Sequence, residues 1–266
     1  MIDSDTLIYR FRQFHAADST KAREPEEIIA ESKMWCSSPE AFNDPFDCNP
    51  NFVMPDKSID DQLRQAERMI EGNGWARNHP QAIRLLDIAR NGGLNSPEVK
   101  VLLPHGMRES IRRSSVCCFT SSWDDPCMWA HYADSHKGYC LAFRLKSEWP
   151  APIVDVDYAG DRPAIDLSVD TPKGSEARLK FAKEMLATKS DHWEPEGEWR
   201  VVRWETPAGF MDFPPEALQH VYLGMRSGAD ERARILKAAA ERKPAIPVYL
   251  VDVHRQAFSF EVEQIG

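Results

Sequence analysis

The chain has 266 residues and a formal net charge of −9 at pH 7, with 42% apolar and 28% charged residues. That length and composition are typical of a globular protein with a sizeable core, and the acidic charge argues against a broad nucleic-acid-binding face. The sequence holds no stretch that is long and apolar enough to span a bilayer, and it does not begin with a basic segment followed by an apolar run. We therefore expect no membrane partner, no signal peptide and a cytoplasmic location.

The cysteine pattern indicates reduced thiols rather than a disulfide framework. Six cysteines are spread over the chain, at positions 36, 48, 117, 118, 127 and 140. Zinc-ligand types recur at Cys127, His131, His136 and Cys140. The spacing of the two histidines does not keep both on one helical face, so we expect no bound metal. Cys118 with His131 is an alternative thiol nucleophile, although a cysteine in an apolar strand is more often part of the core.

The predicted elements of the first half begin with a strand, because residues 7–12 alternate apolar and polar side chains. A short helix opens at Glu24, where a proline and several acids occupy the first turn. Residues 33–36 read as a second strand. Residues 42–47 combine asparagine, aspartate and proline, which favour a turn.

Residues 57–113 have a different pattern. Apolar residues recur there at helical spacing in three runs. The segments Gly72-Asn73-Gly74 and Asn91-Gly92-Gly93 follow the first two runs, and glycine and asparagine are common where a helix ends. The segment 57–113 is therefore predicted to be a helical insertion.

The second half alternates strands and helices less regularly. We predict strands over 116–121, 139–145, 153–158, 198–204, 220–223, 248–253 and 258–262. Helices are expected over 175–189 and 229–241, and a surface loop over 159–172. Strands in both halves, separated by helical blocks, are typical of an α+β fold. We therefore predict a single α+β domain over residues 1–266, with a split or strongly bent central mixed β-sheet.

The segment 129–138 gathers the most functional groups. Trp129, His131, Tyr132 and Asp134 lie within it, directly before the apolar segment that begins at residue 139. A polar helix that leads into a buried strand places titratable side chains at the edge of the core, where a cleft can form. Asp134 follows His131 by three residues and could orient its ring on a helix. The alternative is a satisfied, partly buried histidine.

Two carboxylates, Glu196 and Glu198, precede the predicted strand that holds Arg200. Two strand residues separated by one point to the same side, so the pair could bind a ribose hydroxyl, stabilise an oxocarbenium-like centre or act as acid and base. The alternative is a solvated strand entrance.

Basic and polar side chains accompany the first strand and the first turn. Arg10 and Arg12 fall on one face of the strand, which suits a phosphate, although a structural salt bridge is equally compatible. Asn43, Asp44 and Asp47 bind substrate or cap the turn. The sequence contains neither a G-x-G-x-x-G motif nor a Walker A lysine.

These pieces together resemble a known family. The order L-I-Y-R-F-R, F-N-D-P-F-D, C-F-T-S, M-W-A-H-Y-A-D-S-H-K-G and E-G-E-W-R is similar to the bacterial domain-of-unknown-function family 2971, from about residue 7 to 253. The resemblance brings no activity with it, but it implies an association with phage-resistance genes, and hence a toxic or defensive enzyme.

A weaker resemblance, to ADP-ribosyltransferases, implies a mechanism and an ADP-ribosyltransferase-like fold. Their pattern is an Arg or His on the first strand, an aromatic or Ser/Thr element in the middle, and a Glu at a late strand start. Here Arg10 would be first, residues 131–139 the middle, and Glu198 the catalytic glutamate, with His131 and Tyr132 beside it. The first-strand histidine-glycine pair is missing, and Thr120-Ser121-Ser122 stands in place of an S-T-S motif. The implied substrate-binding residues are Tyr9, Arg10, Arg12, Asn43, Asp44, Asp47, Ser121, Trp129, Asp134, Glu196 and Arg200.

The leading hypothesis is therefore an NAD-dependent ADP-ribosyltransferase or NAD glycohydrolase, with NAD as substrate and a protein or nucleic acid as possible acceptor. A nuclease or hydrolase built from His131, Asp134, Asp44 and Glu198 is a second hypothesis. A non-catalytic sensor of a nucleotide or phage protein is a third. For a single site, six residues should line one cleft: Arg10, Asn43, Asp44, His131, Tyr132 and Glu198.

Overall fold

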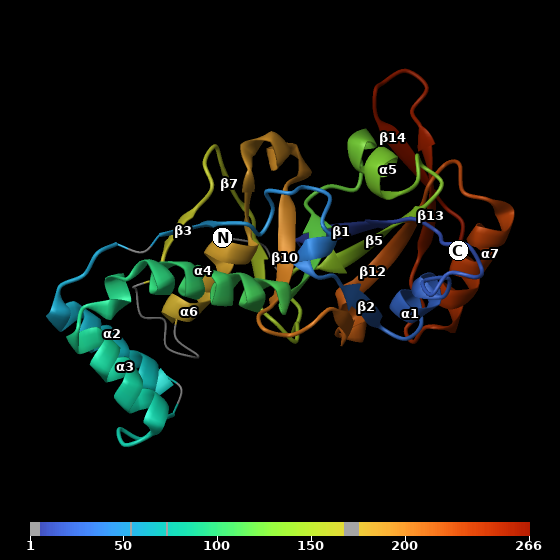
Figure 1. Cartoon of the computed structure of the whole chain (residues 1–266). Helices are drawn as coiled ribbons and strands as arrows, with labels where there is room; N and C mark the ends of the chain where they lie inside the picture. The colour runs from blue at the N-terminus through green and yellow to red at the C-terminus, as the bar shows by residue number, and fades with distance from the viewer. Residues whose placement is uncertain (1–5, 54, 73, 168–175) are drawn as a thin grey trace.

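The computed structural model describes residues 6–53, 55–72, 74–167 and 176–266, and the fold is α+β around a large mixed sheet (Figure 1). The strand order is β14 (Phe260–Gln264), β13 (Val248–Val253), β12 (Leu218–Leu223), β5 (Tyr139–Arg144), β1 (Leu7–Arg12), β4 (Ser115–Thr120), β10 (Glu198–Arg203) and β6 (Ile153–Asp155). Neighbouring strands are antiparallel except β12 and β13, which are parallel. This arrangement confirms the α+β prediction with a mixed central sheet.

The sheet consists of two well-paired parts that meet at one residue pair. Strand β1 pairs with β5 along its whole length, and β4 pairs with β10 in the same way. Between β1 and β4 only Tyr9 and Thr120 are register partners. Beyond that pair the two strands separate, and an isolated bridge between Ser37 and Val116 occupies part of the gap. The sheet is therefore split between its first strand and β4.

Helices cover both faces of the sheet (Figure 1). Helices α1 (Glu24–Ile29) and α7 (Ala229–Glu241) pack on one face, over a core that includes Ile8 and Leu141. Helix α5 (Pro126–Tyr132) packs on the other face, where Trp129 lies against Phe11 in an edge-to-face contact with ring centroids 5.0 Å apart. Because alternate side chains of a strand point to opposite faces, β1 supplies both cores.

The helices predicted between residues 57 and 113 are present. Helices α2 (Ile59–Gly72), α3 (Pro80–Arg90) and α4 (Pro97–Arg112) form in that order, and α2 and α3 extend away from the sheet (Figure 1). Their small shared core is built on Ala66, Ala89 and Leu94. The side-chain oxygen of Ser96 accepts a hydrogen bond from the backbone N–H of Val99 and caps α4.

Several short elements differ from the sequence prediction. The strand expected over 153–158 is two strands, β6 and β7 (Asp157–Ala159). The loop expected over 159–172 contains β8 (Ala164–Asp166), and its residues 168–172 lie outside the described part of the chain. The helix expected over 175–189 is α6 (Glu176–Leu186), followed by strand β9 (Thr188–Ser190).

Strands β3 (Asn51–Val53), β8, β9 and β11 (Gly209–Asp212) were not predicted, and they share a physical reason with the shortened β7, whereas β2 (Lys33–Cys36) was predicted. Strand β8 pairs with β3, β7 pairs with β9, and β11 pairs with β2. Most of these strands have three residues, too few to show a periodicity, and each depends on a partner far away in the sequence. The short 3₁₀ helices are η1 (Pro39–Ala41), η2 (Gly93–Asn95), η3 (Asp191–Glu196) and η4 (Pro215–Ala217).

A left-handed turn joins α5 to β5. Asp134, Ser135 and His136 all have positive φ, at 44°, 54° and 70°. Each such residue costs about 1–2 kcal/mol, so the surrounding structure must hold the turn. Gly138 permits the closest approach, because a Cβ there would overlap the carbonyl oxygen of Arg12. The backbone of the turn is thereby fixed directly against the end of β1.

We predict that Gly138→Ala lowers the free energy of unfolding by at least about 2 kcal/mol, because two backbone segments would have to separate. Gly106 in α4 is the matched control, since a Cβ there meets nothing within 4 Å. Gly106→Ala should instead raise the free energy of unfolding by about 0.5–1 kcal/mol, as alanine favours a helix. Urea denaturation of the three proteins measures both changes, and an unaltered Gly138→Ala variant would contradict the close approach.

Candidate functional site

A cleft of about 380 Å³ opens on the sheet beside the point where β1 and β4 separate. Nine of the residues selected from the sequence line it: Tyr9, Arg10, Arg12, Asn43, Asp47, His131, Tyr132, Glu196 and Glu198. They come from β1, the 42–47 turn, α5, the end of the 3₁₀ helix η3 and the start of β10. Segments separated by up to 189 positions, from Tyr9 to Glu198, therefore meet in one cavity of the size that suits a small molecule.

Two of the selected acids are not among the lining residues. The buried side chain of Asp44 accepts a hydrogen bond from the backbone N–H of Phe46 at 2.9 Å and shapes the turn. Asp134 is exposed beyond the end of α5 and pairs with Lys137 at 3.3 Å. The expectation that Asp134 orients His131 is wrong, because the helix ends at Tyr132 and the chain turns left-handed at Asp134.

Three further residues lie near the cleft without lining it. Trp129 is fully buried, and its indole N–H donates to the carbonyl of Trp123 at 2.8 Å, which makes it a core residue. Ser121 is exposed beside Gly197. Arg200 is also fully buried, and it acts on the cleft through the carboxylates that it binds.

One row of register partners crosses three adjacent strands at the cleft. Tyr9 of β1 pairs with Thr120 of β4, and Thr120 pairs with Glu198 of β10. The strand between the first strand and the glutamate strand is therefore β4, which ends in Thr120-Ser121-Ser122. The segment 131–139 was expected to fill this middle position, but it leads into β5, which lies on the other side of β1.

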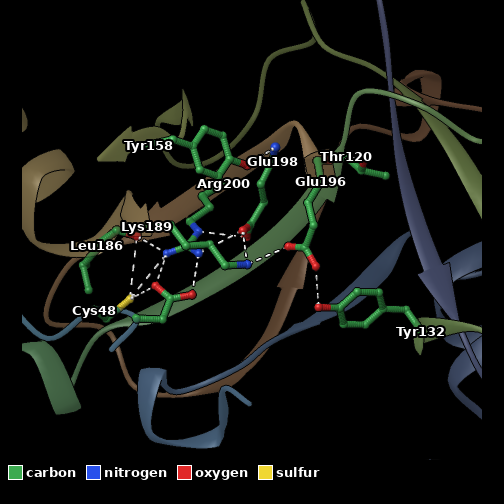
Figure 2. A network of polar contacts seen from close by, with 10 residues as sticks. Cys48, Thr120, Tyr132, Tyr158, Leu186, Lys189, Glu196, Glu198 and Arg200 are labelled. Carbon is green, nitrogen blue, oxygen red and sulfur yellow. Dashed lines mark hydrogen bonds and ion pairs between the residues drawn. The ribbon is translucent and has the colours of Figure 1, made fainter. Parts of the chain in front are cut away.

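A buried guanidinium anchors the carboxylate side of the cleft (Figure 2). Arg200 donates from Nε and Nη2 to Glu198 at 2.8 and 3.0 Å. It also donates from Nη1 and Nη2 to Asp47 at 2.8 and 2.7 Å, and from Nη1 to the carbonyl of Leu186 at 2.7 Å. All five N–H groups of a guanidinium can be satisfied in such a planar arrangement, which is why arginine suits a buried position between two carboxylates.

Lys189 is the main residue of the site that the sequence did not indicate. It belongs to the short strand β9, which was predicted as the end of a helix. Its Nζ donates to Oε2 of Glu196 at 2.6 Å and to Oε2 of Glu198 at 3.1 Å (Figure 2). The centroid of the Trp193 ring lies 4.8 Å from Nζ. No periodicity or motif in the sequence marks this lysine as different from a solvated one.

The glycine of the E-G-E motif, Gly197, determines where its two glutamates lie. Gly197 has a left-handed backbone with φ of 51°, and a Cβ there would overlap the hydroxyl of Ser121. This turn, rather than regular strand alternation, brings Glu196 and Glu198 to the same ammonium group. The hydroxyl of Tyr132 donates to Oε1 of Glu196 at 2.7 Å and fixes the outer carboxylate as well (Figure 2).

The protonation states of the site follow from these contacts. Burial opposes ionisation of Glu198, but Arg200 and Lys189 outweigh it and lower the pKa of Glu198 to about 2. Burial and the hydrogen bond to Glu196 raise the pKa of Tyr132, so this phenol keeps its proton. Burial acts against the charge of Lys189, yet Glu198 and Glu196 raise the pKa of Lys189 above its usual range. Near neutral pH the site therefore holds an ionised Glu198, a charged Lys189 and a neutral Tyr132.

Arginines lie on the other side of the row of paired residues. Arg10 is buried and donates to the thiol of Cys117 and, at 2.9 Å, to the carbonyl of Trp35, so it closes the gap between β1 and β4. Arg12 forms an ion pair with Glu24. The Nε of Arg12 is buried and has no hydrogen-bond partner within the described residues. A buried donor of this kind costs free energy because it has lost its water without gaining a partner.

Comparison with known proteins bears on part of this site. Residues 128–201 match the model of the family described as "Protein of unknown function (DUF2971)". The match confirms the resemblance over the segment that carries His131, Tyr132, Lys189, Glu196 and Glu198. No curated protein and no solved structure matches the chain. Within the described residues, no three His, Cys, Asp or Glu side chains are placed to hold a metal ion, and no helix is long and apolar enough to cross a membrane.

We predict that Glu198→Gln lowers the free energy of unfolding most near neutral pH and less in acid. The folded-state pKa of Glu198 lies below the ordinary value of 4.5, so its stabilisation is complete above about pH 4.5 and is lost as the pH falls toward about 2. The shift corresponds to about 3 kcal/mol. Urea unfolding of both proteins from about pH 7 to about pH 3 measures the difference. A difference that does not change with pH would show that Glu198 is not held ionised.

Proposed function

We propose that this protein cleaves NAD between nicotinamide and ribose, as an ADP-ribosyltransferase or an NAD glycohydrolase. The observation that carries the proposal is the polarity of the cleft. Glu196 and Glu198 line the β10 side of the Tyr9–Thr120 junction, and Arg10 and Arg12 line the β1 side, where the two cations share the single carboxylate of Glu24. NAD has the matching polarity, because a cationic pyridinium-ribose is joined to an anionic diphosphate.

The order of the strands gives independent support. ADP-ribosyltransferases, in the pattern set out above, use a first-strand Arg, a middle Ser/Thr element and a glutamate at a late strand start. In this protein Arg10, Thr120 and Glu198 occupy three adjacent strands, and the last two are direct register partners. The Ser/Thr element is thus better matched by residues 120–122 than by residues 131–139.

Glu198 is suited to electrostatic stabilisation. Loss of nicotinamide develops positive charge on the ribose, and a carboxylate already fixed in place stabilises that charge without reorganisation. Arg200 and Lys189 use three of the roughly four acceptor positions of this carboxylate, and the Cys118 thiol hydrogen-bonds to it as well. A ribose hydroxyl would bind Glu198 by displacing this weak thiol donor. Tyr9 and Tyr132, both half-buried in the cleft wall, offer aromatic surface to the nicotinamide ring.

Glu196 is the outer carboxylate, 13% exposed against 6% for Glu198. It is therefore the group closer to an incoming nucleophile, which is water in a glycohydrolase and a side chain or nucleic-acid group in a transferase. A toxic or defensive role would follow from depletion of NAD or from modification of a cellular target.

The nuclease hypothesis has less geometric support. Of the residues assigned to it, His131 and Glu198 line the cleft, whereas Asp44 and Asp134 do not. A sensor that binds a nucleotide without reaction would use the same cavity, and the variants below separate it from an enzyme.

We predict that Glu198→Gln lowers the rate of nicotinamide release from NAD by about a hundredfold to a thousandfold, because the charge opposite the ribose is removed while the shape is kept. Glu194→Gln is the matched control, since Glu194 is exposed on the same 3₁₀ helix as Glu196. Chromatographic assay of nicotinamide, with circular dichroism to verify folding, measures both variants. If the protein is toxic on expression, Glu198→Gln should also remove the toxicity.

Equal rates for the wild type and a folded Glu198→Gln variant would overturn the catalytic assignment. Absence of nicotinamide release from the wild type, together with saturable NAD binding, would favour the sensor.

A different result is expected for Glu196→Gln. Because Glu196 faces the entrance and Glu198 the ribose, we predict that this change reduces transfer to an acceptor more than it reduces nicotinamide release. Parallel assays of ³²P-labelled acceptor and free nicotinamide give the ratio of the two rates. An equal loss in both assays would assign Glu196 to the cleavage step instead.

A further inference from the structure

The ammonium group of Lys189 lies inside the carboxylate side of the cleft. It contacts Glu196 and Glu198, and the lysine side chain is only 5% exposed. The indole of Trp193 contacts the same ammonium group in cation–π geometry. Lys189 is therefore a fixed positive charge of the site rather than a solvated surface group.

This lysine determines the charge balance of the network. Three carboxylates share two cations, because Asp47, Glu196 and Glu198 are joined through Lys189 and Arg200. One negative charge is thus in excess. Arg200 lies at the base of the network with no exposed surface and does not line the cleft, whereas Lys189 does. A change at Lys189 therefore alters the charge that a ligand in the cleft meets.

The other titratable groups that face this volume do not cancel the excess. Burial raises the pKa of the Cys118 thiol well above its usual value, and burial also keeps Tyr132 protonated, so both are neutral. His131 lies at the exposed rim. Arg10 and Arg12 belong to β1, which β4 separates from the glutamate strand β10, and Glu24 pairs with Arg12 and also attracts Arg10.

We propose that Lys189 determines which ligands the cleft binds. Because Lys189 neutralises one of the three carboxylates, the cleft selects a ring with a single positive charge over a neutral ring and over a doubly charged ring. The inference rests on the proposed function, because the pyridinium of NAD is a ring with a single positive charge. Charge selection can nevertheless be measured by ligand binding alone, without any reaction. Its physical basis is a balance of two effects in a partly buried site. Attraction to one excess negative charge grows in proportion to the charge of the ligand, whereas the cost of removing the ligand from water grows with the square of that charge.

The test compares three ligands that share the carbamoylpyridine ring. They are neutral nicotinamide, singly charged 1-methylnicotinamide and doubly charged 1-(2-aminoethyl)-3-carbamoylpyridinium. NMR titration of each into the full-length protein gives its dissociation constant. For the wild type we expect the singly charged ligand to bind at least about tenfold more tightly than the neutral one, and more tightly than the doubly charged one.

A series of variants changes the charge balance in steps. Glu196→Gln leaves no excess charge and should abolish the preference for the singly charged ligand. Lys189→Met leaves two excess charges and should shift the preference to the doubly charged ligand by about tenfold or more. Lys189→Arg keeps the charge and should keep the wild-type preference. The double variant Lys189→Met with Glu196→Gln restores one excess charge and should restore that preference.

The outcomes are distinguishable from those of the proposed function. An unchanged charge preference in both Glu196→Gln and Lys189→Met overturns the inference, even if NAD is cleaved. Charge selection that follows the series in a protein that does not cleave NAD supports the inference and rejects the enzyme. If Lys189→Met does not fold, Glu196→Gln and the double variant still decide the question, because one removes the excess charge and the other restores it.

Discussion

The buried guanidinium of Arg200 is the interaction on which the rest of the site depends. A charge with no exposed surface costs several kcal/mol unless it is paired and hydrogen-bonded, and Arg200 is satisfied only when Asp47, Glu198 and the carbonyl of Leu186 all surround it. Those partners come from the first turn, the start of β10 and the end of α6. Three segments distant in the sequence are therefore held at one point, and the cleft forms over it.

The single pairing between β1 and β4 has the complementary role. A continuous ladder at this position would bring the two strands within hydrogen-bonding distance along their length and leave no room for a cavity. Because only Tyr9 and Thr120 pair, β1 and β4 separate. The side chain of Arg10 occupies the buried part of the gap between them, and the solvent-accessible part belongs to the cleft. The split costs backbone hydrogen bonds of the sheet, and Arg10 bridges the gap instead by donating to the thiol of Cys117 and to the carbonyl of Trp35.

The long elements could be predicted from the sequence because each carries its own periodicity. Strands β1, β4, β5 and β10 have six residues each, and their alternation or apolar character is local information. Strand β9 has three residues, so Lys189 could not be separated from the end of the preceding helix. Arg200 was visible as part of E-G-E-W-R, but its burial depends on Asp47, 153 positions away. Asp44 and Asp47 lie in the same turn, and only the tertiary contact shows which one reaches the cleft.

The electrostatics of Glu198 limit what this carboxylate can do. With its pKa lowered to about 2, it holds no proton near neutral pH and is a poor proton acceptor, because general base catalysis is most efficient when the pKa lies near the working pH. A carboxylate held ionised by Arg200 and Lys189 instead supplies a fixed negative charge, which requires no reorganisation when positive charge develops nearby. A reaction with a cationic transition state is the chemistry that uses such a group, whereas proton abstraction from a hydroxyl or a water would have to use another side chain at the mouth of the cleft.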